Sequence, residues 1–389
     1  MRKVDLLVVG AGIAGTAAAY IAAKGGASVV LVSEGTGASA LYSGALDWNF
    51  WERGGKPPDD PALPEFASAL GCWTLSAAEC RLATSSGTVR GARGHDGALL
   101  DLEQLRGGAI AVADVERDDF RAELVARSLS ASNWARQTGT RFEAVAVRGI
   151  AYGYERRLCA YDFAELLDAD ERRAWFVERL REAAGACDGW LVGPWLGVDV
   201  ETTQRIRQDL GKPIGEVASL PGGPAGARFE IARDRLLERV RVTRTVGRVT
   251  RVAHVGSAWR ATVRGSALAE LGLEASAVVL AIGGLVGGGV EYRGQSTDGA
   301  GFSLSLDAPL RLELDGEDAT IFSTLRGLDL TTAGFDALER VGIAFDGPEN
   351  GRSGILVAGD CVAAEPRTAL RAALGGIRAA RLTMAPQSR

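Results

Sequence analysis

The amino-acid sequence predicts an α/β fold, because three apolar segments far apart in the chain each end in glycine. These segments are residues 4–9, Val278–Gly284 and Ile355–Asp360. Aliphatic runs of this length are typical of strands buried on both faces of a parallel sheet. The chain has 389 residues and is 47% hydrophobic, which is enough to bury a large core. We therefore expect one parallel sheet to which both ends of the chain contribute strands.

The first segment begins a complete, Rossmann-like βαβ unit. A strand over residues 4–9 is followed by an alanine-rich helix over Thr16–Lys24, and a second strand spans Ala27–Ser33. The glycines between the first strand and the helix have the spacing of a dinucleotide-binding turn. The first glycine permits the tight turn, the second lets the backbone approach a pyrophosphate, and the third lets the helix and the strand pack closely. These glycines are Gly10, Gly12 and Gly15.

Glu34 ends the second strand, where this fingerprint places an acid that accepts hydrogen bonds from a ribose. A carboxylate there would repel a 2′-phosphate, so NADP is disfavoured, while NAD and FAD remain open. The C-terminal segment favours FAD, because the ribityl and isoalloxazine half needs a second turn, and Asp360 is placed to accept hydrogen bonds from ribityl hydroxyls. FMN is the alternative, although Glu34 has a role only if an adenosine ribose is bound.

Other segments complete the predicted cofactor site. A β-meander over Val246–Val252 and Ala258–Val263 returns through Val278–Gly284. An alanine-rich helix over Arg367–Arg381 carries Gly375 and Gly376, which indicate that a flavin ring or pyrophosphate approaches it closely. The loop Thr36–Asp47, rich in small residues and hydroxyls, is expected to meet the flavin N5/O4 edge or else to be a surface loop. The predicted cofactor-binding residues are Gly10, Gly12, Ala14, Gly15, Glu34, Ser43, Gly44, Ala281, Gly283, Gly359, Asp360 and Gly375.

The middle of the chain predicts an insertion. We expect residues 1–85 and 228–389 to form a discontinuous FAD-binding domain, and 86–227 to form an inserted α+β cap that binds substrate or a partner. Residues 51–66 look like an exposed linker. Strands are expected near 109–113 and 190–193, and helices near 119–137 and 170–186. Trp190 and Trp195 could wall a pocket or meet a partner, but packing in a core is the commoner role of such residues.

Candidate catalytic residues are few. Oxidising an alcohol or an amine by hydride transfer to flavin benefits from a general base, often histidine. The chain has two histidines, of which His254 falls in the predicted meander and His95 is the catalytic candidate. Arg90 and Arg367 are placed near the flavin or an anionic substrate, because a guanidinium stabilises the charge of reduced flavin and suits a carboxylate or phosphate. This shortage of bases fits an electron-relaying flavin better than a self-sufficient dehydrogenase.

Composition excludes several classes of protein. A net charge of −5 without a basic cluster argues against nucleic acid as a partner. Five widely spaced cysteines form no Cys-x-x-Cys pair, so no metal or iron–sulfur site is predicted, and reduced thiols indicate the cytoplasm. No apolar run is long enough to span a membrane.

Taken together, these motifs resemble the B subunit of anaerobic glycerol-3-phosphate dehydrogenase, a flavoprotein of the fumarate reductase and succinate dehydrogenase-like group. The resemblance rests on Gly10–Gly15, Ser43–Asp47, Gly87–Arg90, Gly193–Gly197, Ala281–Gly284, Gly359–Asp360 and the glycine-bearing late helix. It implies an FAD-binding fold of the two-dinucleotide type. It also implies a cytoplasmic protein, peripheral to the inner membrane through its partners, which are a second flavoprotein and an iron–sulfur subunit that passes electrons to quinone.

Three functions therefore remain open. The first is the FAD-bearing subunit of a multi-subunit dehydrogenase that oxidises a small, glycerol-3-phosphate-like alcohol. The second is a stand-alone FAD oxidase or dehydrogenase acting on a small amine or hydroxy acid. The third is a non-catalytic subunit that keeps the flavoprotein fold for assembly.

Overall fold

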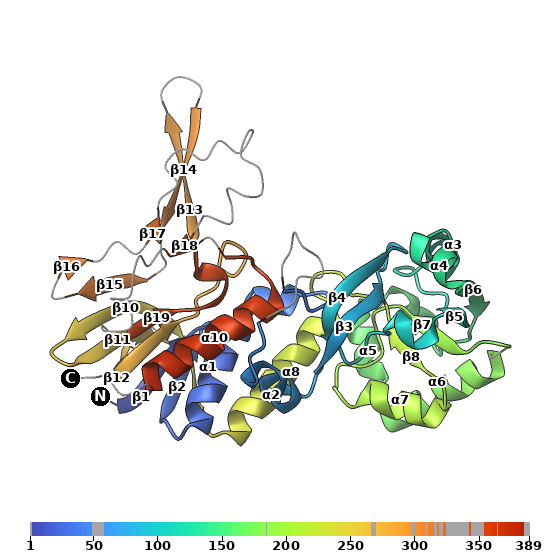
Figure 1. The fold of residues 1–389 in the computed structure, drawn as a ribbon, viewed down its shortest axis with the longest axis horizontal. Helices are drawn as coiled ribbons and strands as arrows, with labels where there is room; N and C mark the ends of the chain where they lie inside the picture. Colours follow the sequence, from blue (N-terminus) through green and yellow to red (C-terminus); the bar gives the residue numbers. More distant parts are fainter. Residues whose placement is uncertain are drawn as a thin grey trace.

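The computed structural model describes residues 2–48, 58–183, 185–265, 270–297, 301–307, 310–314, 317–318, 322–323, 342–343, 354–363 and 365–384. Among these residues the largest sheet has nine strands, in the order β16-β15-β10-β11-β12-β1-β2-β9, with β19 paired to β12 (Figure 1). Its parallel part is made of β1 (Arg2–Val9), β2 (Val29–Ser33), β9 (Thr243–Val246), β12 (Glu270–Leu280) and β19 (Ile355–Val357). Strands from both ends of the chain thus lie in one sheet, on either side of β12, as the sequence predicts.

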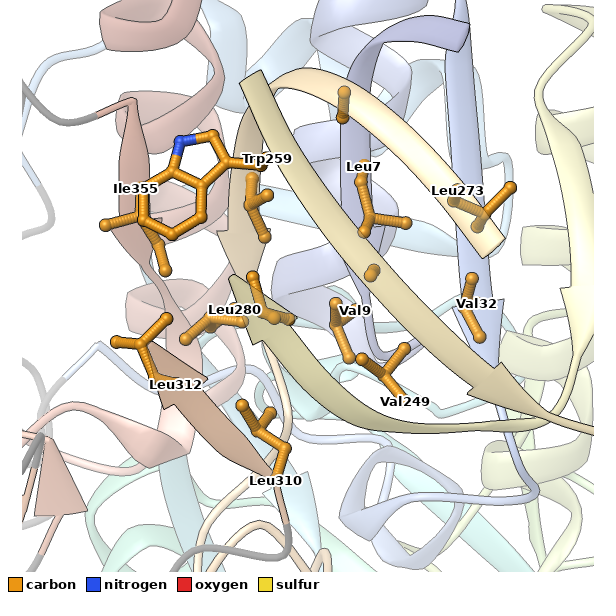
Figure 2. Close-up of a cluster of buried hydrophobic side chains, with 14 of the residues drawn as sticks. Leu7, Val9, Val32, Val249, Trp259, Leu273, Leu280, Leu310, Leu312 and Ile355 are labelled. Carbon is orange, nitrogen blue, oxygen red and sulfur yellow. The ribbon is translucent and has the colours of Figure 1, made fainter. Parts of the chain in front are cut away.

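The alternation of side chains along these strands explains why the sheet is covered on both faces. Leu7 and Val9 point to one face, and Leu6 and Val8 point to the other, because successive residues of a strand face opposite sides. The first face is covered by a meander, and Figure 2 shows Leu7, Val9 and Val32 packed with Val249, Trp259 and Leu312. The meander consists of β10 (Arg248–Val255), β11 (Ala258–Arg264) and the start of β12, with β15 (Arg311–Leu314) and β16 (Glu317–Asp318) beyond β10.

The second face is covered by helices. Helix α1 (Ile13–Lys24) packs on β1, and α10 (Ala369–Met384) packs against α1 (Figure 1). The two helices approach closely because their contact is lined by small residues such as Ala14, Ala18 and Ala380. Helix α8 (Pro224–Arg239) and helix α2 (Ala62–Leu70) extend this layer. Residues 62–66 were expected in an exposed linker, but Leu63 and Phe66 are buried in α2, so that expectation is wrong for this stretch.

The predicted insertion is a second α/β unit. A long hairpin of β3 (Trp73–Ala83) and β4 (Val89–Asp96) leads into a sheet of order β6-β5-β7-β8 (Figure 1). Its strands are β5 (Ala109–Asp114), β6 (Arg141–Ala146), β7 (Gly189–Val192) and β8 (Ile214–Glu216), all paired in parallel. The α+β description of this insertion is therefore corrected, since parallel neighbours need crossover connections, and helices supply them here.

The helices of the insertion are α3 (Ala122–Ser130), α4 (Asn133–Thr138), α5 (Ala160–Leu166), α6 (Asp170–Ala183) and α7 (Thr202–Leu210). The single helix expected near 119–137 is two helices, because Ser132 caps a new one by accepting a hydrogen bond from the Ala135 amide. Trp190 and Trp195 have no exposed surface and pack in the core of this unit.

Short elements complete the described chain. They are the 3₁₀ turns η1 (Ala38–Leu41), η2 (Leu102–Leu105), η3 (Gly153–Arg157) and η5 (Gly359–Cys361), a projecting hairpin of β13 (Glu291–Thr297) and β14 (Gly301–Asp307), and the short pair β17 (Phe322–Ser323) and β18 (Gly342–Ile343). No helix in the described residues is both long and apolar enough to cross a membrane.

Candidate cofactor site

A cavity of about 640 Å³ crosses the carboxyl ends of four neighbouring parallel strands. Its walls include Glu34 after β2, Gly10 after β1, Ala281 after β12 and Ala358 after β19. The carboxyl edge of a parallel sheet is where open α/β folds bind ligands. The cavity therefore lies where the two ends of the chain meet.

Glycines shape the floor of this cavity. Gly10 has φ +107°, and a β-carbon on it would lie 2.1 Å from the Ala281 carbonyl oxygen. A β-carbon on Gly15 would lie 1.9 Å from the Gly10 carbonyl oxygen. Side chains at these positions would push β1, β12 and α1 apart. The residues thus form a bare backbone turn at the N-terminus of α1, which fits the pyrophosphate of a dinucleotide.

Ser39 adds a feature that the glycine spacing did not predict. Its Oγ accepts a hydrogen bond from the Ile13 amide at 3.0 Å, so the η1 turn meets the first residue of α1. Gly12, the N-cap, has no side chain to do this, and a β-carbon there would be 3.1 Å from the Ser39 Oγ. The hydroxyl-rich loop was the available signal for such a contact.

Glu34 lies at the β2 end of the cavity. Its carboxylate is largely exposed and is 3.8 Å from the Nε of Arg248, which also lines the cavity. Val249 follows in the same wall, in β10. A carboxylate facing open space beside a cation can accept hydrogen bonds from sugar hydroxyls. Arg248 was not among the predicted site residues.

Asp360 lies at the β19 end of the cavity, together with Arg367. Burial raises the pKa of the Asp360 carboxyl, and the positive charge of Arg367 offsets part of that rise. Next to it, burial raises the pKa of the Cys361 thiol to about 12, and this thiol donates to the Ala358 carbonyl oxygen at 3.2 Å. Cys361 is thus a packing residue, and Asp360 is the acid available to a bound molecule at this end.

Most of the predicted cofactor residues come together in this one cavity, and some do not. Those that line it are Gly10, Gly12, Ala14, Glu34, Ala281, Gly283, Gly359 and Asp360, with Arg367 from the catalytic set. Gly15 lies behind this lining, in contact with the Gly10 carbonyl oxygen. The placement makes it possible for one extended dinucleotide to contact both Glu34 and Asp360.

Besides Gly15, three predicted cofactor residues lie outside the cavity wall. The Ser43 carbonyl accepts from the Ser219 amide at 2.9 Å and the Gly44 carbonyl accepts from the Asp96 amide at 2.6 Å, so this stretch joins the insertion. Gly375 faces Gly359 of η5, and a β-carbon on it would lie 3.4 Å from the Gly359 amide nitrogen. The tight contact of α10 is made by Gly376, where a β-carbon would lie 2.0 Å from the Ala14 carbonyl oxygen. The sequence predicts that a flavin ring or pyrophosphate approaches these glycines, but the close neighbour of Gly376 is helix α1 and that of Gly375 is η5.

The other two catalytic candidates are also away from the cavity. His95 is 5% exposed, its Nδ1 lies 2.8 Å from the Asp96 carbonyl oxygen, and it sits in the β3–β4 hairpin. Arg90 pairs with Asp47. Neither lines the cavity among the described residues, and their catalytic roles stay predictions.

The dinucleotide fit agrees with comparisons to known proteins. Residues 5–63 match the family model described as an FAD binding domain. The B subunit of the anaerobic glycerol-3-phosphate dehydrogenase of Pectobacterium carotovorum subsp. carotovorum (strain PC1) is 28% identical over 266 residues, which are 59% of this chain and 63% of that protein. The match thus spans less than two thirds of the curated relative's length.

Two solved structures are also similar. Glycine oxidase from Geobacillus kaustophilus is 14% identical, with 98% of this chain and 95% of that chain covered and a TM-score of 0.36. A flavoprotein/dehydrogenase from Cytophaga hutchinsonii is 11% identical, with 98% and 78% covered and a TM-score of 0.36.

Proposed function

From the premise that this chain is an FAD-dependent oxidoreductase, we propose that it is the FAD-bearing subunit of a multi-subunit dehydrogenase. The substrate of the complex would be a small alcohol resembling glycerol 3-phosphate, and the electrons would pass through the FAD of this chain to a partner protein and on to quinone. The observation that supports FAD is the single cavity lined by Gly12 from one end of the chain and Asp360 from the other.

The residues present would hold FAD in a defined order along the strand ends. Glu34 would accept hydrogen bonds from the adenosine ribose, the Gly10–Gly12 turn would receive the pyrophosphate, and Asp360 would accept from the ribityl chain. Arg367 would place a positive charge near the ring system. When bound, FAD supplies an acceptor for a hydride.

The scarcity of bases supports a subunit that relays electrons. An alcohol that loses a hydride must also lose its hydroxyl proton, and a positioned base normally takes it. Among the described residues that line the cavity the carboxylates are Glu34 and Asp360, and no histidine is present. If both carboxylates bind sugar hydroxyls, neither is free to act as that base. This favours the relay over a stand-alone oxidase, the second candidate function.

The partner subunits, the cytoplasmic location and the peripheral membrane position belong to the same proposal. They are supported by the similarity to a protein that is named as a subunit. The role of residues 86–227 as a region that binds substrate or a partner is likewise proposed, as are the domain boundaries.

Anaerobic reduction of the bound flavin tests this function. The purified chain is loaded with FAD and mixed first with glycerol 3-phosphate alone, and then with glycerol 3-phosphate and the remaining subunits of the complex that co-purify with it. Reduction is followed as bleaching of the visible absorption band of the oxidised flavin. We expect little reduction by the chain alone and fast reduction within the complex. Fast turnover of a small amine or hydroxy acid with oxygen by the isolated chain would contradict the proposal.

A further inference from the structure

Tyr42 follows the η1 turn and lines the cavity. It belongs to the same apolar cluster as Ala369 and Ala372, which lie in the first turn of α10 and also line the cavity. Five residues after Tyr42, the Asp47 carbonyl oxygen accepts a hydrogen bond from the Leu370 amide of α10 at 3.3 Å. This loop therefore runs toward the β19 side of the cavity, whereas Glu34 follows β2. The end that holds Tyr42 is therefore the one proposed for the ribityl and isoalloxazine half of FAD.

The hydroxyl of Tyr42 is anchored to a buried acid. It donates to the Oδ2 of Asp96 at 3.1 Å, and Asp96, at the end of β4, has no exposed surface. The ring packs edge-on against Phe229 of α8, with centroids 6.3 Å apart. Burial, followed by the charge of Asp96, raises the pKa of the Tyr42 phenol, so the phenol remains a donor. The anchor leaves the ring as the part of Tyr42 that a ligand can contact.

Asp96 is in turn held by Arg228 of α8. The Arg228 Nε donates to Asp96 Oδ1 at 2.8 Å, and its Nη2 donates to Glu216 Oε2 at 2.6 Å. Arg228 and Glu216 are each 1% exposed. Glu216 ends β8 in the sheet of the insertion, and it also accepts a hydrogen bond from the Leu196 amide. Three buried charges therefore connect the insertion to the wall of the cavity.

Such a cluster has few alternative arrangements. A buried charge is costly unless it is paired and hydrogen-bonded, so displacing any member would leave another without compensation. Arg228 also donates from Nη1 to the Gly197 carbonyl oxygen, so all three nitrogens of its guanidinium are hydrogen-bonded. The cluster thus fixes the position of Asp96, and Asp96 fixes the hydroxyl of Tyr42.

We propose that Tyr42 contacts the isoalloxazine end of FAD, and that Asp96, Arg228 and Glu216 are positioning residues through which the insertion sets the place of that contact. The inference rests on the proposal that the cavity binds FAD. It assigns to a buried ion cluster, which the predicted site did not include, a role in shaping the cofactor site.

The test measures cofactor binding without turnover. Apoprotein of wild type and of Tyr42→Phe, Tyr42→Ala and Asp96→Asn is titrated with FAD, and flavin fluorescence and the visible spectrum are recorded. We expect Tyr42→Phe to bind FAD about tenfold more weakly, because a hydrogen bond to a charged group is lost and the ring is released. Tyr42→Ala should bind more weakly still, and the visible band of its bound flavin should shift.

Glu155→Gln is the matched control. Glu155 is a buried carboxylate of the insertion, and it pairs with Arg172 at 2.6 Å without contact to Tyr42. It should lower thermal stability while leaving FAD affinity and the flavin spectrum unchanged. Tyr42→Phe keeps all buried charges paired, so it serves if Asp96→Asn does not fold.

The outcomes separate the two proposals. Equal losses of FAD affinity in Tyr42→Phe, in Asp96→Asn and in the double variant would support the inference that Asp96 acts on FAD through Tyr42, because the effects of coupled residues are not additive. Tyr42→Phe and Tyr42→Ala with wild-type affinity and spectrum would overturn this inference and leave the FAD site intact. A wild-type chain that binds no FAD would overturn the FAD site itself.

Discussion

Gly376 shows at the level of one residue how the two ends of the chain are joined. A β-carbon there would lie 2.0 Å from the Ala14 carbonyl oxygen, so α10 and α1 would have to move apart to accept it. We expect Gly376→Ala to lower the free energy of unfolding by about 1–3 kcal/mol, the usual cost of overpacking, and to weaken FAD binding. Chemical denaturation of the apoprotein measures the first effect and FAD titration the second.

Gly375 is the control for that experiment, on the same helix. A β-carbon there would meet its nearest neighbour, the Gly359 amide nitrogen, at 3.4 Å, so it needs little adjustment. Because alanine is favoured over glycine in a helix by up to about 1 kcal/mol, Gly375→Ala should be neutral or stabilising. Equal destabilisation by both substitutions would show that the contact between α1 and α10 is not the constraint.

Asp360 links stability to the cofactor site. Burial raises the pKa of its carboxyl above the ordinary 3.8, so the folded apoprotein retains a proton that the unfolded chain has lost. The contribution of this group to the free energy of unfolding therefore falls as pH rises from about 3.8 through the raised value. We expect apo Asp360→Asn to be more stable than wild type at pH about 7 and to bind FAD more weakly. Thermal melts at several pH values check this, and a less stable Asn variant at neutral pH would contradict it.

At the level of elements, the parallel strands and α1 could be predicted because local chemistry determines them. Aliphatic runs ending at Gly10, Gly283 and Gly359 specify buried strands and turns without reference to distant residues. The spacing of Gly10, Gly12 and Gly15 also predicted the turn that lines the cavity. For these elements, the residues that determine the local structure are the same residues that make it recognisable in the sequence.

Other parts could not be predicted because their constraints are long-range. Arg228 is 132 residues from Asp96 in sequence, and nothing in the amphipathic pattern of α8 distinguishes it from an exposed arginine. Gly375 and Gly376 are adjacent, and only the rotation of α10 against α1 decides which one needs to be glycine. The α2 helix was missed since Gly and Pro just before it suggested a linker, while Phe66 is buried by packing against Tyr20 and Trp73.

The contact between α8 and η1 offers a test at the level of elements. A β-carbon on Gly226 would lie 1.8 Å from the Ala40 carbonyl oxygen, so Gly226→Ala should push η1 away from α8. Since η1 carries Ser39 in the cavity wall, we expect weaker FAD binding together with a lower melting temperature. Ala227→Ser, at the next and half-buried position, is the control and should change neither by much. Unchanged FAD affinity in Gly226→Ala would show that η1 does not position the cofactor.

The fold as a whole determines how fast each of the five cysteines reacts. Cys159 is exposed, while Cys187 is partly buried with a pKa raised by burial. Cys72, Cys80 and Cys361 are buried, and burial raises the pKa of Cys80 to about 11 and of Cys361 to about 12. We expect one thiol to react quickly with an aromatic disulfide reagent, one slowly, and three only on unfolding. Fast reaction of three or more thiols in the native protein would contradict this packing.

The architecture as a whole places one cofactor across two distant parts of the chain. β1 and α1 come from the N-terminal end, and β19, η5 and α10 come from the C-terminal end, yet they border one cavity. The insertion then reaches the same wall through buried charges. Binding energy should therefore depend on both halves of the dinucleotide being present, since each half meets a different end of the chain.

Titration of the apoprotein with FAD and, separately, with FMN and ADP tests this central claim most directly. We predict that one FAD binds per chain, at least about tenfold more tightly than FMN, because FMN has no adenosine ribose for Glu34. ADP should compete with FAD, and Asp360→Asn should weaken FAD and FMN but leave ADP unaffected. FMN binding as tightly as FAD, or no competition by ADP, would contradict a site shared by the two ends of the chain.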